Sequence, residues 1–339
     1  MIHSTIQTVT GPIAADQCTM VLSHEHLFID LTNQAMPQAL KRPLTSADYP
    51  DLMRNPYLLK DNLLIESFND AEEECRRLIQ VGCNTVVDCT TSEIGRNPAL
   101  LQKLAKASGM NIVMGCGNYT ADTHTKAFLE TSADEAAEHL LDEVTHGISG
   151  IRPGIIGEIG TSREILPSEH KALLIAARVQ KKTHLAVQVH IYPWCTNGLD
   201  VIRTLTEAGV CPDRIVICHS DVSLDRDYIF AMLSKGVYVQ FDNFGKEFTP
   251  ETGGFAAGRF AKDTERVRMA AECIRKGFEE RILFTNDICL KCMLKRYGGQ
   301  GYTHIFANII PQLEHEGIPA DLIRGLILRE NPLRLLASN

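Results

Sequence analysis

The 339-residue sequence is poor in aromatic residues, has a single tryptophan, Trp194, and lacks any long block of Lys and Arg. Nucleic acids and anionic membranes bind clustered positive charge, so a formal net charge of -8 argues against both as partners. No apolar run approaches the roughly 18 residues of a membrane span, and the first ten residues lack the basic-then-apolar pattern of a signal peptide. We therefore expect a cytoplasmic protein whose partner is a small molecule.

The cysteines follow no disulfide framework. They number eleven, an odd count, and are scattered through apolar segments of the chain. In a cytosolic chain such residues are more often buried thiols than disulfides. With 44% hydrophobic and 22% charged residues, the composition is that of a globular protein with a large core.

Short β-branched runs alternate with amphipathic helical stretches, which is typical of repeated β-α units around a parallel sheet. Counting from the first His pair, eight strands are predicted, at residues 19–26, 84–89, 111–115, 154–158, 185–190, 214–219, 237–241 and 281–287. This pattern predicts an α/β fold, a single (β/α)8 TIM barrel, in one domain over residues 1–339. The functional site of such a barrel lies at the carboxyl ends of its strands.

The flanking segments predict additions to the barrel. Residues 6–9 and the Gly11-Pro12 turn indicate a short N-terminal β hairpin that plugs one end. Residues 31–60 form a long irregular connection of the kind that serves as a lid or binding loop. A C-terminal helical extension ends in a helix for which Asn331 and Pro332 suit the N-cap and first position.

A His-x-His pair near the end of the first strand is the first sign of chemistry. Side chains two apart in a strand point the same way, so His24 and His26 can bind one metal ion. Imidazole suits zinc and its neighbours in the first transition row. The pair alone is a weak signal among twelve histidines. However, Glu158, His190, His219 and Asp287 also end predicted strands, and six such residues at matching depth are hard to explain as structural.

Six ligands fit two divalent ions, most simply zinc, with manganese or cobalt as alternatives. We expect His24, His26 and Asp287 to hold one ion, and His190 and His219 the other, with Glu158 bridging them. A hydroxide between ions about 3.5–4 Å apart would be the nucleophile. Asp287 would be the catalytic residue that orients this hydroxide and accepts its proton.

These residues, with Gly157-Glu158-Ile159-Gly160, His219-Ser220-Asp221, the segment 296–302 and Glu330-Asn331-Pro332, resemble the phosphotriesterase-like branch of the amidohydrolase superfamily. The likeness covers nearly the whole chain and is strongest to phosphotriesterase-related and phosphotriesterase homology proteins. It implies an amidohydrolase-type metal-dependent hydrolase in which the six residues bind the metals, usually zinc. Dimers are common in the family, so a homodimer is one expectation.

Two departures from the organophosphate-degrading members bear on the substrate. Those members bridge their metals with a carboxylated lysine, where this chain has Glu158, and they pass a proton to a His on strand 7, whereas residues 237–242 contain none. The resemblance therefore implies hydrolysis of a small amide, lactone or ester, such as N-acetyltaurine or a sugar lactone. The alternatives are phosphotriester or phosphoester hydrolysis on the same site, and a non-catalytic, metal-containing protein that binds a ligand.

Loop residues could bind the substrate. Tyr119 could donate a hydrogen bond to the polarised substrate oxygen, or simply pack. A rim that favours a sulfonate, carboxylate or phosphate could be formed by Lys246, Lys291, Arg296 and Tyr302; its alternative is solvated loop charge. Trp194 could wall the pocket or anchor its loop, and Asp221 could orient a metal ligand. Asp30 and Asp242 are expected to be loop or supporting groups.

Overall fold

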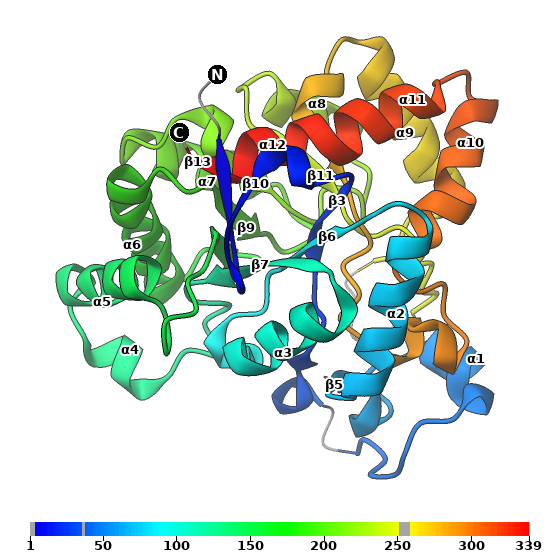
Figure 1. Cartoon of the computed structure of the whole chain (residues 1–339), viewed down its shortest axis with the longest axis horizontal. Helices are drawn as coiled ribbons and strands as arrows, with labels where there is room; N and C mark the ends of the chain where they lie inside the picture. Colours follow the sequence, from blue (N-terminus) through cyan, green and yellow to red (C-terminus); the bar gives the residue numbers. More distant parts are fainter. Residues whose placement is uncertain (1–3, 36–37, 251–257, 339) are drawn as a thin grey trace.

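The computed structural model describes residues 4–35, 38–250 and 258–338 (Figure 1). Eight parallel strands form one sheet in the order β12, β11, β10, β9, β8, β7, β6, β3. Their bounds are β3 Val21–Glu25, β6 Thr85–Asp88, β7 Asn111–Cys116, β8 Ile155–Gly160, β9 Val187–His190, β10 Ile215–Ile217, β11 Tyr238–Phe241 and β12 Ile282–Phe284. Each strand pairs with the next in the chain, as repeated β-α units require.

Side chains join the two end strands of the sheet, β3 and β12. The Thr285 hydroxyl lies 2.7 Å from the His24 carbonyl oxygen, and the Glu25 carboxylate accepts the backbone N–H of Asn286 at 2.8 Å. The sheet is thereby nearly closed into a barrel, which confirms the predicted (β/α)8 architecture. Within the described ranges no helix has the length and apolarity of a membrane span.

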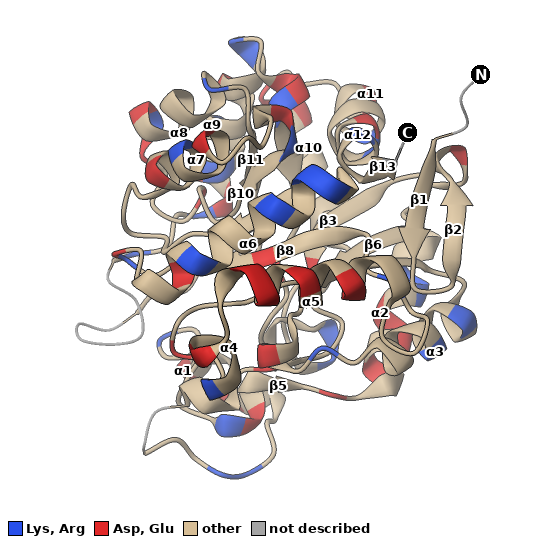
Figure 2. Ribbon diagram, turned by 90° about the vertical axis from the view of Figure 1, so that its left-hand side faces the viewer, with Lys and Arg blue, Asp and Glu red and all other residues tan. Residues whose placement is uncertain are grey.

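The helices around the sheet begin at residues suited to that position. Ser67, Asn97 and Ser132 accept the N–H three residues on, which satisfies a free donor of the first turn. The helices after successive strands are α2 Phe68–Gln80, α3 Pro98–Ser108, α4 Lys126–Glu130, α5 Ala133–His146, α6 Pro167–Thr183, α7 Gly198–Glu207, α8 Arg226–Leu233 and α9 Asp263–Arg275. Figure 2 shows acidic α5 beside basic α6, where Lys182 pairs with Glu138 at 2.7 Å.

Two predicted strands end two or three residues earlier than expected. β10 ends at Ile217 and β12 at Phe284, so His219 and Asp287 lie just beyond their strands. His219 has φ +56° and Asp287 has φ +48°, and residues in this left-handed region do not belong to a strand. Both side chains are consequently presented by tight turns at the carboxyl end of the sheet.

The amino end of the barrel is closed by both ends of the chain. The hairpin of β1 Thr5–Thr8 and β2 Gly11–Ala14 pairs antiparallel, and β1 also pairs with β13 Ala337–Ser338. Ile6 is fully buried and shares a core cluster with Leu335 and with strand residues such as Val21. The predicted N-terminal plug is confirmed, and the C-terminus joins it.

The C-terminal helices differ from the prediction at one point. They are α10 Ile310–His315, α11 Ala320–Leu322, a π-helix over Ile323–Glu330 and α12 Asn331–Leu336. Glu330 and Asn331 both have helical dihedral angles, so Asn331 continues a helix instead of capping one. Its buried side-chain amide donates to the carbonyl oxygens of Glu279 and Ile282, which ties this helix to the start of β12.

Two sequence expectations concern the cysteines and the long connection. All eleven cysteines lie in the described part of the chain as free thiols, and eight of them are buried. In residues 31–60 the structure has the helix α1 Tyr49–Leu52, short 3₁₀ helices at Thr32–Gln34 and Ser46–Asp48, and an isolated bridge between Leu40 and Leu59. Residues 36–37 are outside the described ranges. Leu31, Pro56 and Tyr57 from this connection line the main cavity, in agreement with a binding loop.

Candidate metal centre

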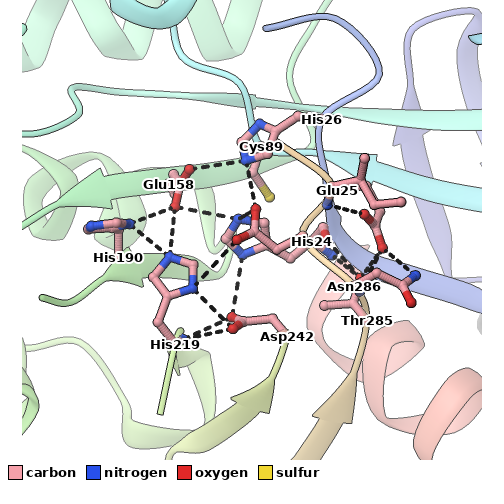
Figure 3. A network of polar contacts seen from close by, with 12 residues as sticks. His24, Glu25, His26, Cys89, Glu158, His190, His219, Asp242, Thr285 and Asn286 are labelled. Carbon is pink, nitrogen blue, oxygen red and sulfur yellow. Dashed lines mark hydrogen bonds and ion pairs between the residues drawn. The ribbon is translucent and has the colours of Figure 1, made fainter. Parts of the chain in front are cut away.

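The six predicted ligands meet at the carboxyl end of the barrel. Figure 3 labels five of them and shows the four histidines around Glu158. Glu158 Oε1 lies 3.3 Å from His26 Nε2, and Oε2 lies 3.4 Å from both His24 Nε2 and His190 Nδ1. His219 Nε2 is 3.5 Å from the same Oε2. One carboxylate therefore faces four imidazoles, which is the placement expected of a bridging group.

Asp287 completes the group on the side of the first His pair. Its Oδ1 lies 3.2 Å from His26 Nε2 and 3.6 Å from His24 Nε2. The ligand atoms of His24, His26 and Asp287 all lie within 4.8 Å of one another, and so do those of His24, Glu158 and His219. His190 Nδ1 lies 2.8 Å from His219 Nε2, so it also borders the second set.

The chemistry of this group fits divalent cations better than a purely hydrogen-bonded cluster. His24 Nε2 and Glu158 Oε2 are buried and have no hydrogen-bond partner among the described residues. Buried polar atoms are normally satisfied, and such exceptions point to a missing ion or water. His190 Nδ1 and His219 Nε2 also lie 2.8 Å apart. If both nitrogens carry lone pairs, as metal ligands do, they repel each other unless a cation lies nearby.

Neighbouring groups fix the orientation of three imidazole rings. His24 Nδ1 lies 3.1 Å from Gln240 Oε1, and His26 Nδ1 lies 2.9 Å from the Thr90 hydroxyl. His219 Nδ1 lies 3.0 Å from Asp242 Oδ1. A partner on Nδ1 leaves Nε2 free to bind a metal and holds the ring in place.

The carboxylate that orients His219 is Asp242, which was expected to be a loop or supporting group. Asp221, expected to orient a metal ligand, has no hydrogen bond or ion pair with any of the six in the described part of the chain. Asp242 also accepts the His219 backbone N–H. Asp221 is linked to Asp242 through Asn243, whose side-chain amide donates to both carboxylates. Asp221 also accepts the Asn243 backbone N–H and pairs with Arg266 at 3.3 Å. Asp221 was favoured because it lies two residues after His219 in the sequence. His219 has a left-handed backbone, and its ring contacts Asp242, which follows β11.

Buried charges tune the ionisation of the histidines. Burial lowers the pKa of His26, but Asp287 and Glu158 outweigh it and raise that pKa to about 10. Burial and the neighbouring His219 lower the pKa of His190. Burial opposes the charged form of Glu158, yet His24 and the other imidazoles hold its pKa well below the usual range. A carboxylate with a lowered pKa is ionised at neutral pH, which the predicted bridging role of Glu158 requires.

A buried lysine stands beside Asp287. Lys246 Nζ donates to Asp287 Oδ2, and both side chains are only 6% exposed. Burial raises the pKa of Asp287, but Lys246 and His26 outweigh that effect and lower it. The pair keeps Asp287 charged while leaving Oδ1 directed at His24 and His26.

Glu25, between the two histidines, was not predicted to have a role. It is fully buried, and its carboxylate accepts Asn286 N at 2.8 Å, Asn286 Nδ2 at 2.9 Å and Ile288 N at 2.9 Å (Figure 3). These bonds hold the backbone on both sides of Asp287. Alternation along β3 was the available signal, since it directs Glu25 away from the metal face toward the neighbouring strand.

The cluster opens into a cavity of about 600 Å³ at the carboxyl end of the barrel. Of the predicted substrate residues, Tyr119 and Lys246 line this cavity, and so does Trp194. The Tyr119 hydroxyl lies 3.2 Å from His190 Nδ1. A phenol is thus available next to the candidate ligands.

Three other predicted substrate residues are absent from the cavity lining within the described ranges. Lys291 is buried against Asp61 at 2.6 Å, and Arg296 pairs with Asp70 at 3.2 Å. Tyr302 is buried and donates its hydroxyl to the His26 carbonyl oxygen at 2.7 Å. The structure does not bring them into the predicted rim, because local carboxylates and backbone already use their polar groups.

Arg163 lines the cavity and was missed from the sequence. Its exposed guanidinium lies 5.0 Å from the centre of the Tyr192 ring. It follows β8 in a loop, where sequence offers no periodicity from which its direction could be read.

The chain is similar to several known proteins over nearly its whole length. An N-acetyltaurine hydrolase of Danio rerio is 34% identical over 345 residues, covering 98% of this chain and 97% of that protein. The solved structure of a resiniferatoxin-binding protein from Rhodobacter sphaeroides has a TM-score of 0.93 at 30% identity, with 98% and 94% coverage. An organophosphorus hydrolase from Deinococcus radiodurans has a TM-score of 0.78 at 30% identity, with 98% and 97% coverage. Residues 4–336 match the model of the phosphotriesterase family, and the chain belongs to that family.

Proposed function

We propose that this protein is a metal-dependent hydrolase that cleaves a small amide, lactone or ester at two divalent cations. The observation that carries the proposal is the pair of unpartnered buried atoms, His24 Nε2 and Glu158 Oε2, at the centre of six metal-binding side chains. His24, His26 and Asp287 would hold one ion, and His190 and His219 the other, with Glu158 shared. Zinc is the favoured metal, with manganese and cobalt as alternatives.

Bound divalent ions would polarise the substrate carbonyl and lower the pKa of a water molecule. The chain's own groups supply the rest of the chemistry. Asp287 Oδ1 faces the cluster, where it can orient the attacking water and accept its proton. Burial raises the pKa of the Tyr119 phenol well above its usual range, so the phenol stays protonated and can donate to the developing oxyanion.

A carbonyl substrate is favoured over a phosphotriester by the seventh strand. At β11 the side chain nearest His24 is Gln240, whose amide oxygen is already within 3.1 Å of His24 Nδ1, and Asp242 contacts His219. The Gln240 amide cannot take up a proton, and the Asp242 carboxylate is already engaged by the His219 ring and backbone N–H. The similarity to N-acetyltaurine hydrolases over 98% of this chain supports the same choice.

For an anionic substrate, two cations in the cavity are available. Lys246 is buried and already paired with Asp287, whereas Arg163 is exposed at the cavity and has no carboxylate partner within 4 Å among the described residues. Arginine binds sulfonates and carboxylates through two parallel N–H groups. We propose Arg163 as the main residue that binds the substrate anion. Lys246 would add to the positive electrostatic potential of the cavity.

The proposal is tested by proton release from a small panel of substrates, with chelator-treated protein measured alongside. The panel contains N-acetyltaurine, an uncharged N-acetyl amide, a sugar lactone and an aryl dialkyl phosphate. We expect hydrolysis of one acyl class, abolished by chelation and by Asp287→Asn, and restored by zinc. Equal turnover by metal-free and metal-replete protein would contradict the proposal.

Two similar structures favour the alternative functions, phosphoester hydrolysis and non-catalytic ligand binding. The organophosphorus hydrolase with a TM-score of 0.78 favours phosphoester chemistry, which the aryl dialkyl phosphate tests. The resiniferatoxin-binding protein with a TM-score of 0.93 favours a non-catalytic binder. A binder would retain its affinity for the organic ligand in Asp287→Asn, whereas a hydrolase loses turnover.

The remaining predictions concern the whole molecule. A single domain over residues 1–339, a cytoplasmic location and a homodimer stay predictions from the sequence and the family likeness. Sedimentation equilibrium of purified protein measures the oligomeric state, and a single cooperative unfolding transition is the result expected of one domain.

A further inference from the structure

The cavity beside the candidate metal centre is larger than an acetyl amide needs. Its volume of about 600 Å³ lies in the range of about 300–1,000 Å³ that holds drug-sized ligands. Water occupies about 30 Å³ per molecule in the liquid, so there is room for roughly twenty groups of that size. N-acetyltaurine has about ten non-hydrogen atoms and leaves roughly half of this space to be filled.

The unfilled space has a continuous aromatic lining, here called the aromatic wall, made of Tyr192, Trp194, Phe260 and Phe248. The ring centre of Trp194 lies 5.6 Å from that of Tyr192 and 5.3 Å from that of Phe260. Phe260 in turn lies 5.3 Å from Phe248. These edge-to-face contacts fix the rings relative to one another, so the wall is largely preformed.

The aromatic wall and the candidate metal ligands line the same cavity. Tyr192 is two residues beyond His190, and Phe248 is two residues beyond Lys246. The Trp194 indole N–H donates to the Arg259 carbonyl oxygen at 3.3 Å, which anchors the middle of the wall. A ligand in this part of the cavity can therefore contact both the rings and the candidate ligands.

The part of an N-acyl amide that suits these rings is its acyl chain. The taurine part is short and charged, and its proposed partner Arg163 lies at the Tyr192 end of the wall, 5.0 Å from that ring. Burying the charge against the other three rings without a partner is unfavourable. Each buried methylene instead improves binding by up to about fourfold. Acetyl has no methylene and gains nothing from the wall.

We propose that the aromatic wall binds an apolar acyl chain, so that the preferred substrates are N-acyl amides with an acyl group of about six to ten carbons. The part of this inference that calls these amides substrates rests on the proposed hydrolase function. The binding of an apolar chain to the wall does not depend on turnover.

Trp194 provides a direct binding assay, because it is the only Trp in the chain and lies in the aromatic wall. Its fluorescence is measured during titration of the metal-replete protein with decanoate, below micelle formation, and with acetate. We expect a saturable change with decanoate at a concentration at least about tenfold lower than with acetate. Phe260→Leu should weaken decanoate binding several-fold. The matched control is Phe230→Leu in α8, whose ring packs on Phe278 away from the cavity and which should bind like wild type.

A second assay measures kcat/KM for acetyl, hexanoyl and decanoyl taurine. We expect kcat/KM to rise at least about tenfold from acetyl to hexanoyl. Phe260→Leu should flatten this dependence on chain length, whereas the control Phe230→Leu should keep it. If decanoate leaves Trp194 fluorescence unchanged and acetyl is the best substrate, the inference is overturned while the hydrolase proposal stands. If decanoate binds but no acyl amide is cleaved, the hydrolase proposal fails and the apolar binding site remains.

Discussion

The Glu25 carboxylate accepts the backbone N–H of Asn286 at 2.8 Å, and this bond joins the first strand of the barrel to the turn that carries Asp287. The same carboxylate accepts the N–H of Ile288 at 2.9 Å, so the residues on both sides of Asp287 are held by one side chain. In the sequence His24-Glu25-His26, the two histidines are candidate metal ligands on one face at the end of β3. Glu25 points to the other face and supports a third candidate ligand, Asp287, through the backbone.

Glu25→Gln should disturb Asp287 without removing a candidate ligand. The new amide can accept through only one oxygen, so one of the two backbone N–H groups loses its acceptor. We expect a loss of about 2–4 kcal/mol in the free energy of unfolding and a fall of about 10–100-fold in metal affinity. Urea denaturation and metal titration measure both. The control is Glu130→Gln, an exposed residue at the end of α4; equal effects of the two variants would contradict the role of Glu25.

Asp242→Asn should weaken the binding of one ion more than the other. Asp242 orients His219, whereas His24 and His26 have other partners on Nδ1. We expect the affinity of the second ion to fall by about 10–100-fold while the first is bound nearly as before. Competitive chelator titration, followed by elemental analysis, gives the two affinities. A uniform loss of both ions would count against a separate second site.

Asp263 should make the stability of the protein fall at acid pH, because its carboxylate holds the loop that carries Gly245 and Lys246. Asp263 accepts Gly245 N at 3.0 Å and contacts Arg266 at 2.9 Å and His304 at 2.6 Å. Burial raises its pKa, but His304 and Arg266 outweigh burial and hold that pKa below the ordinary value near 3.8.

A lowered folded-state pKa means that the unfolded chain binds the proton more tightly. The contribution of Asp263 to stability is therefore complete above about pH 4 and is lost as the pH falls through the lower folded value. Denaturation of wild type and Asp263→Asn at several pH values should show a difference of about 2–4 kcal/mol at neutral pH. The difference should shrink below about pH 4. A difference independent of pH would refute this assignment.

Arg163→Gln should separate charge recognition from chemistry. If the exposed guanidinium binds the substrate anion, KM for N-acetyltaurine should rise about tenfold with kcat nearly unchanged. Turnover of an uncharged N-acetyl amide should stay within about twofold. Arg296→Gln is the matched control, because Arg296 is paired with Asp70 outside the cavity lining. A larger effect of Arg296→Gln would restore the rim predicted from the sequence.

The barrel and the ligand cluster could be predicted because both follow from periodicity. Alternation in β3 places His24 and His26 on one face, and polar residues at strand ends stand out against β-branched runs. The side-chain roles in the loops could not be predicted in this way. Tyr302 and Arg163 both lie in irregular segments, and only the fold reveals that one is buried against the His26 carbonyl oxygen while the other reaches the cavity. Asp221 and Asp242 show the same limit, since a single left-handed residue, His219, decides which carboxylate it meets.

The most direct test of the account is a zinc titration of metal-free protein, with hydrolysis of the best acyl substrate recorded at each step. Six side chains centred on Glu158 predict that activity is absent without metal and rises to a plateau at about two ions per chain. Full activity without metal, or a plateau at one ion per chain that a second ion leaves unchanged, would contradict the two-metal hydrolase proposed here.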